Sequence, residues 1–150
     1  MREAIALSLD NVRSGRGGPF GAVIARGGEV VGRGANGVTA SNDPTAHAEI
    51  LAIRAACQTL GSFELSDCEL YASCEPCPMC LGAIYWARLE RYYYANTRED
   101  AARAGFDDSR IYEEIARPAE LRAVQGSRML LDGAGGAFEE WLRSGAKVPY

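Results

Sequence analysis

A chain of 150 residues has the length of one domain and can bury a core without disulfide bonds. Hydrophobic residues make up 47% of it and charged residues 24%, as is typical of soluble globular proteins. The net charge is −4 and the 16 lysines and arginines are scattered, which argues against a nucleic-acid partner, and no apolar run is long enough to cross a bilayer.

The N-terminal part of the chain predicts a helix followed by a β-hairpin. Apolar residues recur at helical spacing over residues 2–14, and Gly15 ends this helix. Two short strands follow, at residues 20–25 and 30–35, joined by a turn with two glycines. The glycine cluster at residues 15–18 lies between a helix and a strand. That is the wrong order for a dinucleotide-binding loop, so we expect a turn there.

The middle of the chain predicts two helices on either side of a strand. Asp43-Pro44 has the residue types of a helix start, a capping carboxylate followed by proline. This helix is expected to run to a stop near Gly61. A strand at residues 69–73 leads into a cysteine-rich segment, and Pro78 then opens the next helix, which continues to Arg88.

The C-terminal part predicts two more strands, at residues 91–95 and 128–131, and helices near residues 108–116 and 136–144. Tyr92 to Tyr94 have the β-propensity of a buried strand, so we expect them to pack in the core. Strand and helix signals alternate after the hairpin. The chain is therefore predicted to be α/β, a single domain with a mostly parallel, five-stranded central sheet and helices on both faces.

Two short motifs carry the candidate metal ligands, His47-Ala48-Glu49 and Pro76-Cys77-Pro78-Met79-Cys80. His47, Cys77 and Cys80 offer one nitrogen and two sulfurs, the ligand types that Zn²⁺ prefers. Three protein ligands leave the fourth tetrahedral position open for water, which is typical of a catalytic zinc. Zinc-bound water loses its proton near neutral pH, and Glu49 is the right type of group to move protons.

The spacing of these motifs fits the mouth of a helix better than its middle. Side chains two residues apart point roughly 200° away from each other on a helix, so His47 and Glu49 can serve one site only near the helix start. Pro78 similarly places Cys77 at a cap position and Cys80 in the first turn. Two helix N-termini are then expected to converge on the metal, where their positive dipole ends favour thiolates.

The other cysteines leave one alternative for the ligand set. Cys74 also forms a C-x-x-C pair with Cys77, but it would end the strand and point away from the helix mouth, so Cys77 and Cys80 are preferred. Cys57 and Cys68 are expected to be small buried hydrophobes. Clustered cysteines, together with an N-terminus that lacks the apolar core of a signal peptide, favour metal chemistry in a reducing compartment. We therefore expect a cytoplasmic location.

The pattern H-x-E followed by P-C-x-x-C is the signature of the zinc deaminases, and with it the chain resembles the cytidine-deaminase superfamily. Within this superfamily the chain is most similar to the small bacterial guanine deaminases. The similarity is carried by residues 17–24, 41–49, 73–88 and 104–109 and by the terminal Tyr150. It spans nearly the whole chain and is weakest over residues 116–147. The resemblance implies a cytidine-deaminase-like fold, a three-layer αβα sandwich around a mixed sheet.

The resemblance also implies a reaction. Zinc held by His47, Cys77 and Cys80 would activate a hydroxide that attacks C2 of guanine. Glu49 would pass the protons so that xanthine and ammonia form. Asp108 resembles a second carboxylate beside the leaving amine, and its alternative role is to cap the helix that follows it. The implied substrate contacts are Phe20, Asn36, Ala48, Trp86 and Tyr150; for Phe20 and Trp86 the alternative is a place in the core.

The implied partners are a purine base and a second copy of the chain, in a homodimer whose C-terminal segment crosses to the other subunit. Neither nucleic acid nor a membrane is expected. Three alternative functions stay open. The first is the same chemistry on guanosine, cytosine or another aminated heterocycle. The second is deamination of adenosine in transfer RNA, which the scattered basic residues disfavour. The third is a non-catalytic zinc-binding protein, which would have no need of Glu49.

Overall fold

The computed structural model describes residues 1–149, so Tyr150 lies outside the described residues. The chain divides into two compact units, with the boundary after Arg110. The first unit contains the sheet and both zinc-site motifs. No helix among residues 1–149 is both long and apolar enough to cross a membrane.

The sheet of the first unit has four strands in the order β2-β1-β3-β4. Strands β1 (Gly21–Arg26) and β2 (Glu29–Ala35) form the predicted antiparallel hairpin. Strand β3 (Cys68–Cys74) runs antiparallel to β1 and parallel to β4 (Arg91–Asn96). The sheet is therefore mixed, as the resemblance implies, and the prediction of a mostly parallel sheet is wrong, because of the described strand pairs only β3–β4 is parallel.

The prediction of a fifth strand at residues 128–131 is wrong, because this segment has no strand pairing. The side chains of Met129, Leu130 and Leu131 are 77%, 72% and 69% exposed. A short apolar run adopts strand structure only where a neighbouring strand pairs with it and a core covers one face. Residues 111–149 contain no strand and no buried residue, so the segment 128–131 has neither a strand partner nor a core to cover one face.

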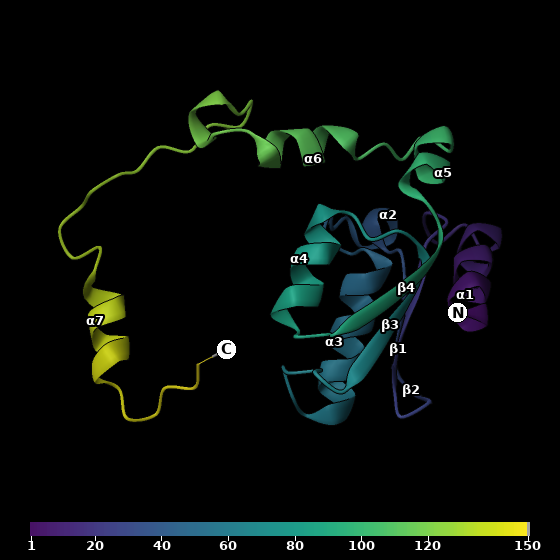
Figure 1. Ribbon diagram of the computed structural model, residues 1–150, viewed down its shortest axis with the longest axis horizontal. Helices are drawn as coiled ribbons and strands as arrows, with labels where there is room; N and C mark the ends of the chain where they lie inside the picture. The colour runs from purple at the N-terminus through teal and green to yellow at the C-terminus, as the bar shows by residue number, and fades with distance from the viewer. Residues whose placement is uncertain (150) are drawn as a thin grey trace. The chain divides into compact units, whose positions relative to one another are not determined.

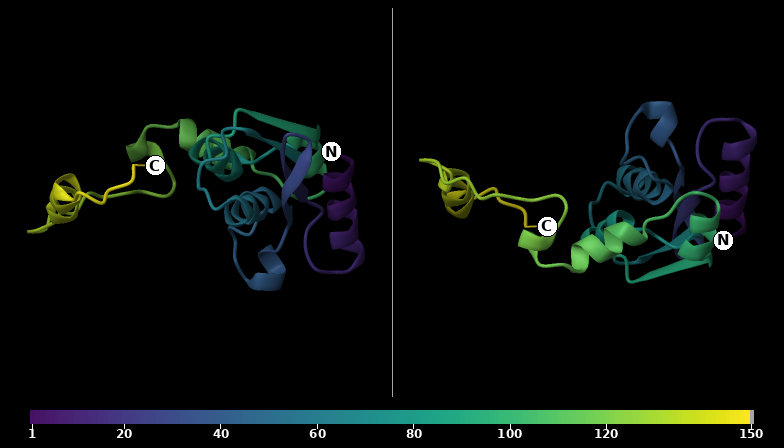
Figure 2. Two further views of the ribbon diagram at one scale, coloured as in Figure 1. Left: turned by 90° about the horizontal axis from the view of Figure 1, so that it is seen from below. Right: turned by 90° about the horizontal axis from the view of Figure 1, so that it is seen from above.

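Helices cover both faces of the sheet and complete the three layers (Figures 1 and 2). Helix α1 (Arg2–Arg13) packs on β1, while α3 (Ala48–Leu60) and α4 (Pro78–Trp86) lie on the opposite face. The helices approach closely because glycines face them. A Cβ atom added to Gly34 on β2 would lie 2.1 Å from the Ala48 carbonyl oxygen of α3, and one added to Gly21 on β1 would lie 2.4 Å from the Ala4 carbonyl oxygen of α1.

The core lies between the sheet and α3. Its largest fully buried side chains are Ile24, Leu65, Leu70, Cys68 and Cys80. The tyrosines of β4, which were expected there, are instead partly exposed: Tyr92, Tyr93 and Tyr94 are 38%, 41% and 44% exposed. Strand β4 is the edge of the sheet and pairs only with β3 in the described chain, so it lacks the cover that a central strand receives.

Two short helices complete the first unit, α2 (Val38–Ser41) and α5 (Arg98–Arg103). Helix α6 (Ser109–Ala116) begins in the last residues of the first unit and continues into the second. The second unit also contains a 3₁₀ turn (Ala119–Leu121) and α7 (Gly136–Arg143). The helices predicted near residues 108–116 and 136–144 are thus confirmed. None of residues 111–149 is buried, and this unit exposes many apolar side chains. A single domain over the whole chain remains a prediction.

Candidate active site

Two helix N-termini bring the predicted metal ligands together. His47 is the N-cap residue of α3 and Cys77 the N-cap residue of α4, both with extended backbone, and Cys80 follows within the first turn of α4. The predicted start of α3 at Asp43-Pro44 is wrong by four residues. Asp43 instead accepts hydrogen bonds from the backbone and hydroxyl of Thr45, which closes a turn before the helix. His47 consequently lies at the helix mouth itself.

The three ligand atoms have the separations that a tetrahedral zinc ion requires. Nδ1 of His47 is 3.5 Å from Sγ of Cys77 and 3.5 Å from Sγ of Cys80. Zn–N bonds of about 2.0 Å and Zn–S bonds of about 2.3 Å at tetrahedral angles place nitrogen and sulfur about 3.5 Å apart. All three atoms lie within 4.8 Å of one another, and no other group of His, Cys, Asp or Glu in residues 1–149 does so. The donor set therefore fits zinc bound through Nδ1.

Cys74 lies apart from this ligand group. Its side chain is buried, and Sγ donates a hydrogen bond to the Thr97 carbonyl oxygen at 3.4 Å. Burial raises the pKa of the Cys74 thiol to about 11, which disfavours the thiolate that a metal needs. The geometry thus agrees with the choice of Cys77 and Cys80 over Cys74.

The protein groups of the site by themselves favour one thiolate. A hydrogen bond from Cys80 lowers the pKa of Cys77 to about 4, and the neighbouring His47 acts in the same direction. The same hydrogen bond raises the pKa of Cys80, which acts as its donor. The hydrogen bond to Cys77 also raises the pKa of His47. Zinc binding would displace the remaining protons, because thiolate and neutral imidazole are the ligating forms.

Glu49 lies in the first turn of α3, next to the ligands and 7% exposed. Burial raises the pKa of its carboxyl group, and the negative charge of Cys77 adds to the shift. A carboxyl whose pKa moves toward neutrality can both accept and return a proton in one reaction. The position and electrostatics of Glu49 therefore suit a proton carrier at the metal.

A cavity of about 470 Å³ opens above these residues, within the first unit. This volume is in the range of small-molecule sites. The cavity wall is formed by loops and helix ends from five parts of the unit and includes Gly18, Phe20, Asn36, Val38, Thr39, Pro44, His47, Glu49, Cys74, Glu75, Cys77, Arg98, Ala101, Gly105, Phe106, Asp107 and Asp108. Of the predicted site residues, Phe20, Asn36, His47, Glu49, Cys77 and Asp108 thus share one cavity.

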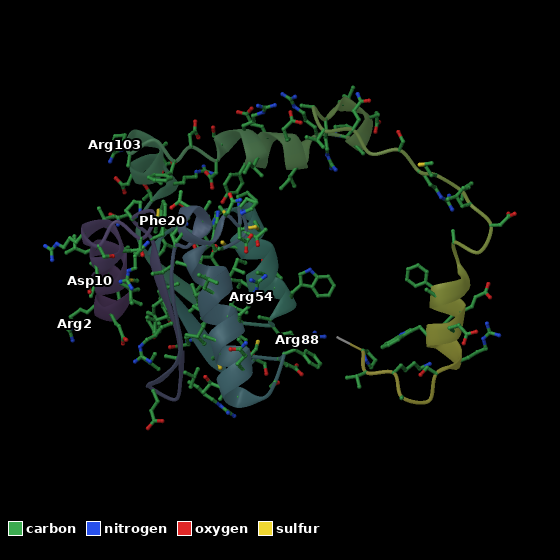
Figure 3. The ribbon with its side chains drawn as sticks, turned by 180° about the vertical axis from the view of Figure 1, so that it is seen from behind. Arg2, Asp10, Phe20, Arg54, Arg88 and Arg103 are labelled. Carbon is green, nitrogen blue, oxygen red and sulfur yellow. The ribbon has the colours of Figure 1, made fainter. Side chains whose placement is uncertain are left out.

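Both aromatic and acidic groups line this cavity. The rings of Phe20 and Phe106 meet edge to face, with centroids 5.0 Å apart and an interplanar angle of 85°. Figure 3 places Phe20 at the end of the sheet where α5 also lies. Burial raises the pKa of the Asp108 carboxyl, as does the nearby negative charge of Cys77. A flat apolar ring with polar edges would match this combination.

Two of the predicted contacts, Ala48 and Trp86, do not line the cavity, and a third lies outside the described residues. Ala48 is buried between His47 and Glu49, with its carbonyl oxygen against β2. Trp86 is at the opposite end of α4 from Cys77, roughly 13 Å away at 1.5 Å per residue, and is 68% exposed. Tyr150 lies outside the described residues. Substrate contacts from these three residues remain predictions.

The sequence interpretation missed several cavity residues, notably Phe106, Arg98 and Asp107. Phe106 and Asp107 belong to the segment 104–109, whose resemblance to guanine deaminases was the available signal. Nothing in the local pattern indicates that Arg98 at the start of α5 lines the cavity, because that follows only from the parallel pairing of β3 with β4.

The chain is similar to known proteins along its whole length. Residues 1–96 match the family described as the cytidine and deoxycytidylate deaminase zinc-binding region. The chain is 52% identical over 150 residues to guanine deaminase of Bacillus subtilis (strain 168), which covers 100% of this chain and 96% of that protein. The X-ray structure of Bacillus subtilis guanine deaminase matches with a TM-score of 0.95 over 99% of this chain and 95% of that chain, at 52% identity.

Two further relatives are more distant. A structure of guanine deaminase from Nitrosomonas europaea matches with a TM-score of 0.68 and 33% identity, over 71% of this chain and 62% of that chain. A tRNA-specific adenosine deaminase of Agrobacterium fabrum is 49% identical over 76 residues, which is 51% of this chain and 50% of that protein. Full-length similarity is thus found with a guanine deaminase, while the tRNA enzyme matches over half of the chain. The chain belongs to the cytidine and deoxycytidylate deaminase family of zinc-dependent enzymes, within its guanine deaminase branch.

Proposed function

We propose that the enzyme hydrolyses guanine to xanthine and ammonia, with His47, Cys77 and Cys80 as zinc ligands and Glu49 and Asp108 as catalytic carboxyl groups. The observation that carries the proposal is the position of segment 104–109. The part of the chain that resembles guanine deaminases beyond the shared zinc motif contributes Gly105, Phe106, Asp107 and Asp108 to the cavity that also holds Glu49.

Zinc held by His47, Cys77 and Cys80 would supply a water whose pKa is lowered toward neutrality. Glu49 would accept one proton from this water and deliver it to a ring nitrogen beside C2, which makes C2 easier to attack. The other proton of the water would leave with the amine as ammonia, so that the water oxygen is retained as the C2 carbonyl of xanthine. A raised pKa suits Glu49 for both transfers, because it must hold a proton between them.

The remaining cavity residues bind the base in this proposal. Phe20 and Phe106 provide apolar surface for the ring, and Asn36 provides a polar contact at its edge. Asp108 accepts hydrogen bonds from the exocyclic amine and can relay a proton to it, because burial raises the pKa of its carboxyl. Ala48, Trp86 and Tyr150 are kept as proposed contacts on the basis of the resemblance.

A panel of aminated rings tests the substrate. We expect kcat/KM for guanine to exceed that for cytidine, adenosine, guanosine and cytosine when ammonia release is measured on zinc-loaded protein. Ribose should be excluded, since a pocket closed around a bare base leaves no room for the sugar. Comparable turnover of a nucleoside would contradict the proposal, and activity on a tRNA anticodon stem would favour the RNA-directed alternative.

We also propose a cytoplasmic homodimer in which the C-terminal segment crosses to the partner. Exposed apolar side chains on two parts of the chain support this. Trp86 and the edge strand β4 expose aromatic rings on the first unit, and α7 exposes Phe138 and Leu142 at 76% and 70%. Apolar surface of this extent is usually covered by a partner. The five cysteines are free, as a reducing compartment would keep them.

The C-terminal tail offers a separate test of this arrangement. Deleting residues 148–150 should leave zinc content and fold intact but lower guanine turnover sharply, because a tail that closes the cavity would exclude water and add contacts to the base. Circular dichroism, metal analysis and steady-state kinetics on the truncated protein measure this. Full activity would show that the tail is dispensable.

A further inference from the structure

A buried polar network connects α1 with the wall of the cavity. Asn11 on α1 is 3% exposed and is one of the few buried polar side chains of residues 1–149. Its Nδ2 group donates to the carbonyl oxygen of Gly18 at 2.9 Å and to that of Asn36 at 2.8 Å. Both acceptors belong to residues that line the cavity. Asn11 itself does not line the cavity.

The same network fixes the backbone on either side of Asn36. The Gly18 carbonyl also accepts from the Phe20 backbone at 2.8 Å, and the Asn36 backbone donates to the Phe20 carbonyl at 3.0 Å. The contact between the loop and the end of β2 is close, since a Cβ atom on Gly17 would lie 2.2 Å from the Asn36 carbonyl oxygen and 2.9 Å from Nδ2 of Asn11. Asn11 therefore connects α1 directly to Gly18 and Asn36 and, through these two residues, to Phe20.

This backbone arrangement determines which way the Asn36 amide points. Its Oδ1 atom accepts from the backbone N–H groups of Gly18 at 3.3 Å and Val38 at 3.4 Å. Backbone N–H groups can only donate, so the amide oxygen must face them and the amide nitrogen must face away. Within residues 1–149 Nδ2 of Asn36 has no acceptor, and no side-chain nitrogen or oxygen there is both fully buried and unpaired. This N–H₂ group is consequently open to the cavity.

We propose that Asn11 is a positioning residue for recognition of the base: it holds the Gly18 and Asn36 carbonyls so that the Asn36 amide directs its N–H groups at a hydrogen-bond acceptor on the ring. The inference rests on the proposed role of Asn36 in binding the base. A ring carbonyl or an unprotonated ring nitrogen satisfies this donor, whereas a ring amine in the same place would leave two donors facing each other. The network thus contributes to substrate choice from outside the cavity.

A double-mutant cycle tests this role. Asn11→Ala should raise KM for guanine about tenfold, as expected for one misplaced hydrogen bond, and should change kcat little, since the contact is made in the ground state as well as in the transition state. Asn36→Ala should raise KM at least as much. Adding Asn11→Ala to Asn36→Ala should then change KM less than about twofold, because the two residues act through one contact.

Two further variants separate positioning from stability. Leu7→Ala shortens a half-buried side chain of α1, whose Cβ atom lies near Gly21 of β1, without touching the network. It should lower Tm and leave KM unchanged. Asn11→Ser keeps one donor, so it should give an intermediate KM and is available if Asn11→Ala does not fold. Zinc content and Tm are measured for every variant.

The possible failures can be told apart. Additive effects of Asn11→Ala and Asn36→Ala on KM, or a lowered Tm with unchanged KM in Asn11→Ala, would overturn the inference. An unchanged KM in Asn36→Ala would overturn it too, while guanine turnover by that variant would leave the proposed function standing. If the unaltered enzyme prefers another aminated ring, the cycle is measured on that ring. Failure of the proposed function therefore does not prevent the test.

Discussion

Replacing Glu49 with glutamine is expected to abolish most of the activity while the enzyme keeps its zinc and its fold. Glutamine matches the shape of glutamate and can still form hydrogen bonds in the first turn of α3, but it cannot accept a proton. Loss of a general acid–base group typically lowers the rate by about 10²–10⁴-fold. We expect kcat on guanine to fall at least that far, because Glu49 serves more than one proton transfer.

The measurement compares kcat, bound zinc and thermal stability of the two proteins. Glu99→Gln is a matched control, because Glu99 is an exposed carboxylate on α5 outside the cavity wall, and it should leave all three quantities unchanged. Activity of Glu49→Gln within tenfold of the unaltered enzyme would show that another group carries the protons. Of the cavity carboxyls with a raised pKa, Asp108 would then be the first candidate.

Removing a ligand thiol is expected to remove the metal and with it the reaction. Cys77→Ala and Cys80→Ala should each contain far less than the one zinc per chain expected for the unaltered protein, and neither should release ammonia from guanine. The reason is that two ligands hold zinc far more weakly than three in a site whose fourth position is taken by water. Atomic absorption on dialysed protein measures this loss.

Cys74→Ala is the matched control for these variants. Cys74 carries the same side chain, lies one C-x-x-C spacing before Cys77 and is bound to the Thr97 carbonyl rather than grouped with His47. It should keep its full complement of zinc. Retained zinc in Cys80→Ala together with loss in Cys74→Ala would show that the first C-x-x-C pair binds the metal.

The zinc site can be predicted from the sequence because its requirements are local. Pro78 at the first helical position and Cys77 before it define the N-terminus of α4, and Cys80 follows three residues after Cys77. His47 is likewise predicted to lie near a helix N-terminus, although α3 begins four residues later than Asp43-Pro44 indicates. Asp43 does not cap the helix, because its carboxylate instead accepts a hydrogen bond from Thr45 in a turn before the helix. The hairpin is similarly evident from short-range patterns, whereas these patterns predict a mostly parallel sheet and miss the antiparallel pairing of β1 with β3.

Features that depend on distant neighbours cannot be predicted in this way. The tyrosines of β4 have strand propensity, but their exposure follows from the place of β4 at the sheet edge. In α1 the apolar residues Ile5, Leu9 and Val12 correctly predict a helix, yet they are 44%, 45% and 50% exposed. The buried face carries Asn11 instead, whose partners are seven and 25 residues away in the chain. No local pattern reveals that contact.

The most direct test of the central claim is product analysis on guanine with zinc-loaded enzyme. Chromatography of the purine products and an independent ammonia assay are run on the same reaction, before and after the metal is removed with a chelator. The account predicts one xanthine and one ammonia for each guanine consumed, loss of both products with the metal, and recovery when zinc is returned. Guanine left intact by zinc-loaded protein that deaminates cytidine or adenosine under the same conditions would contradict it.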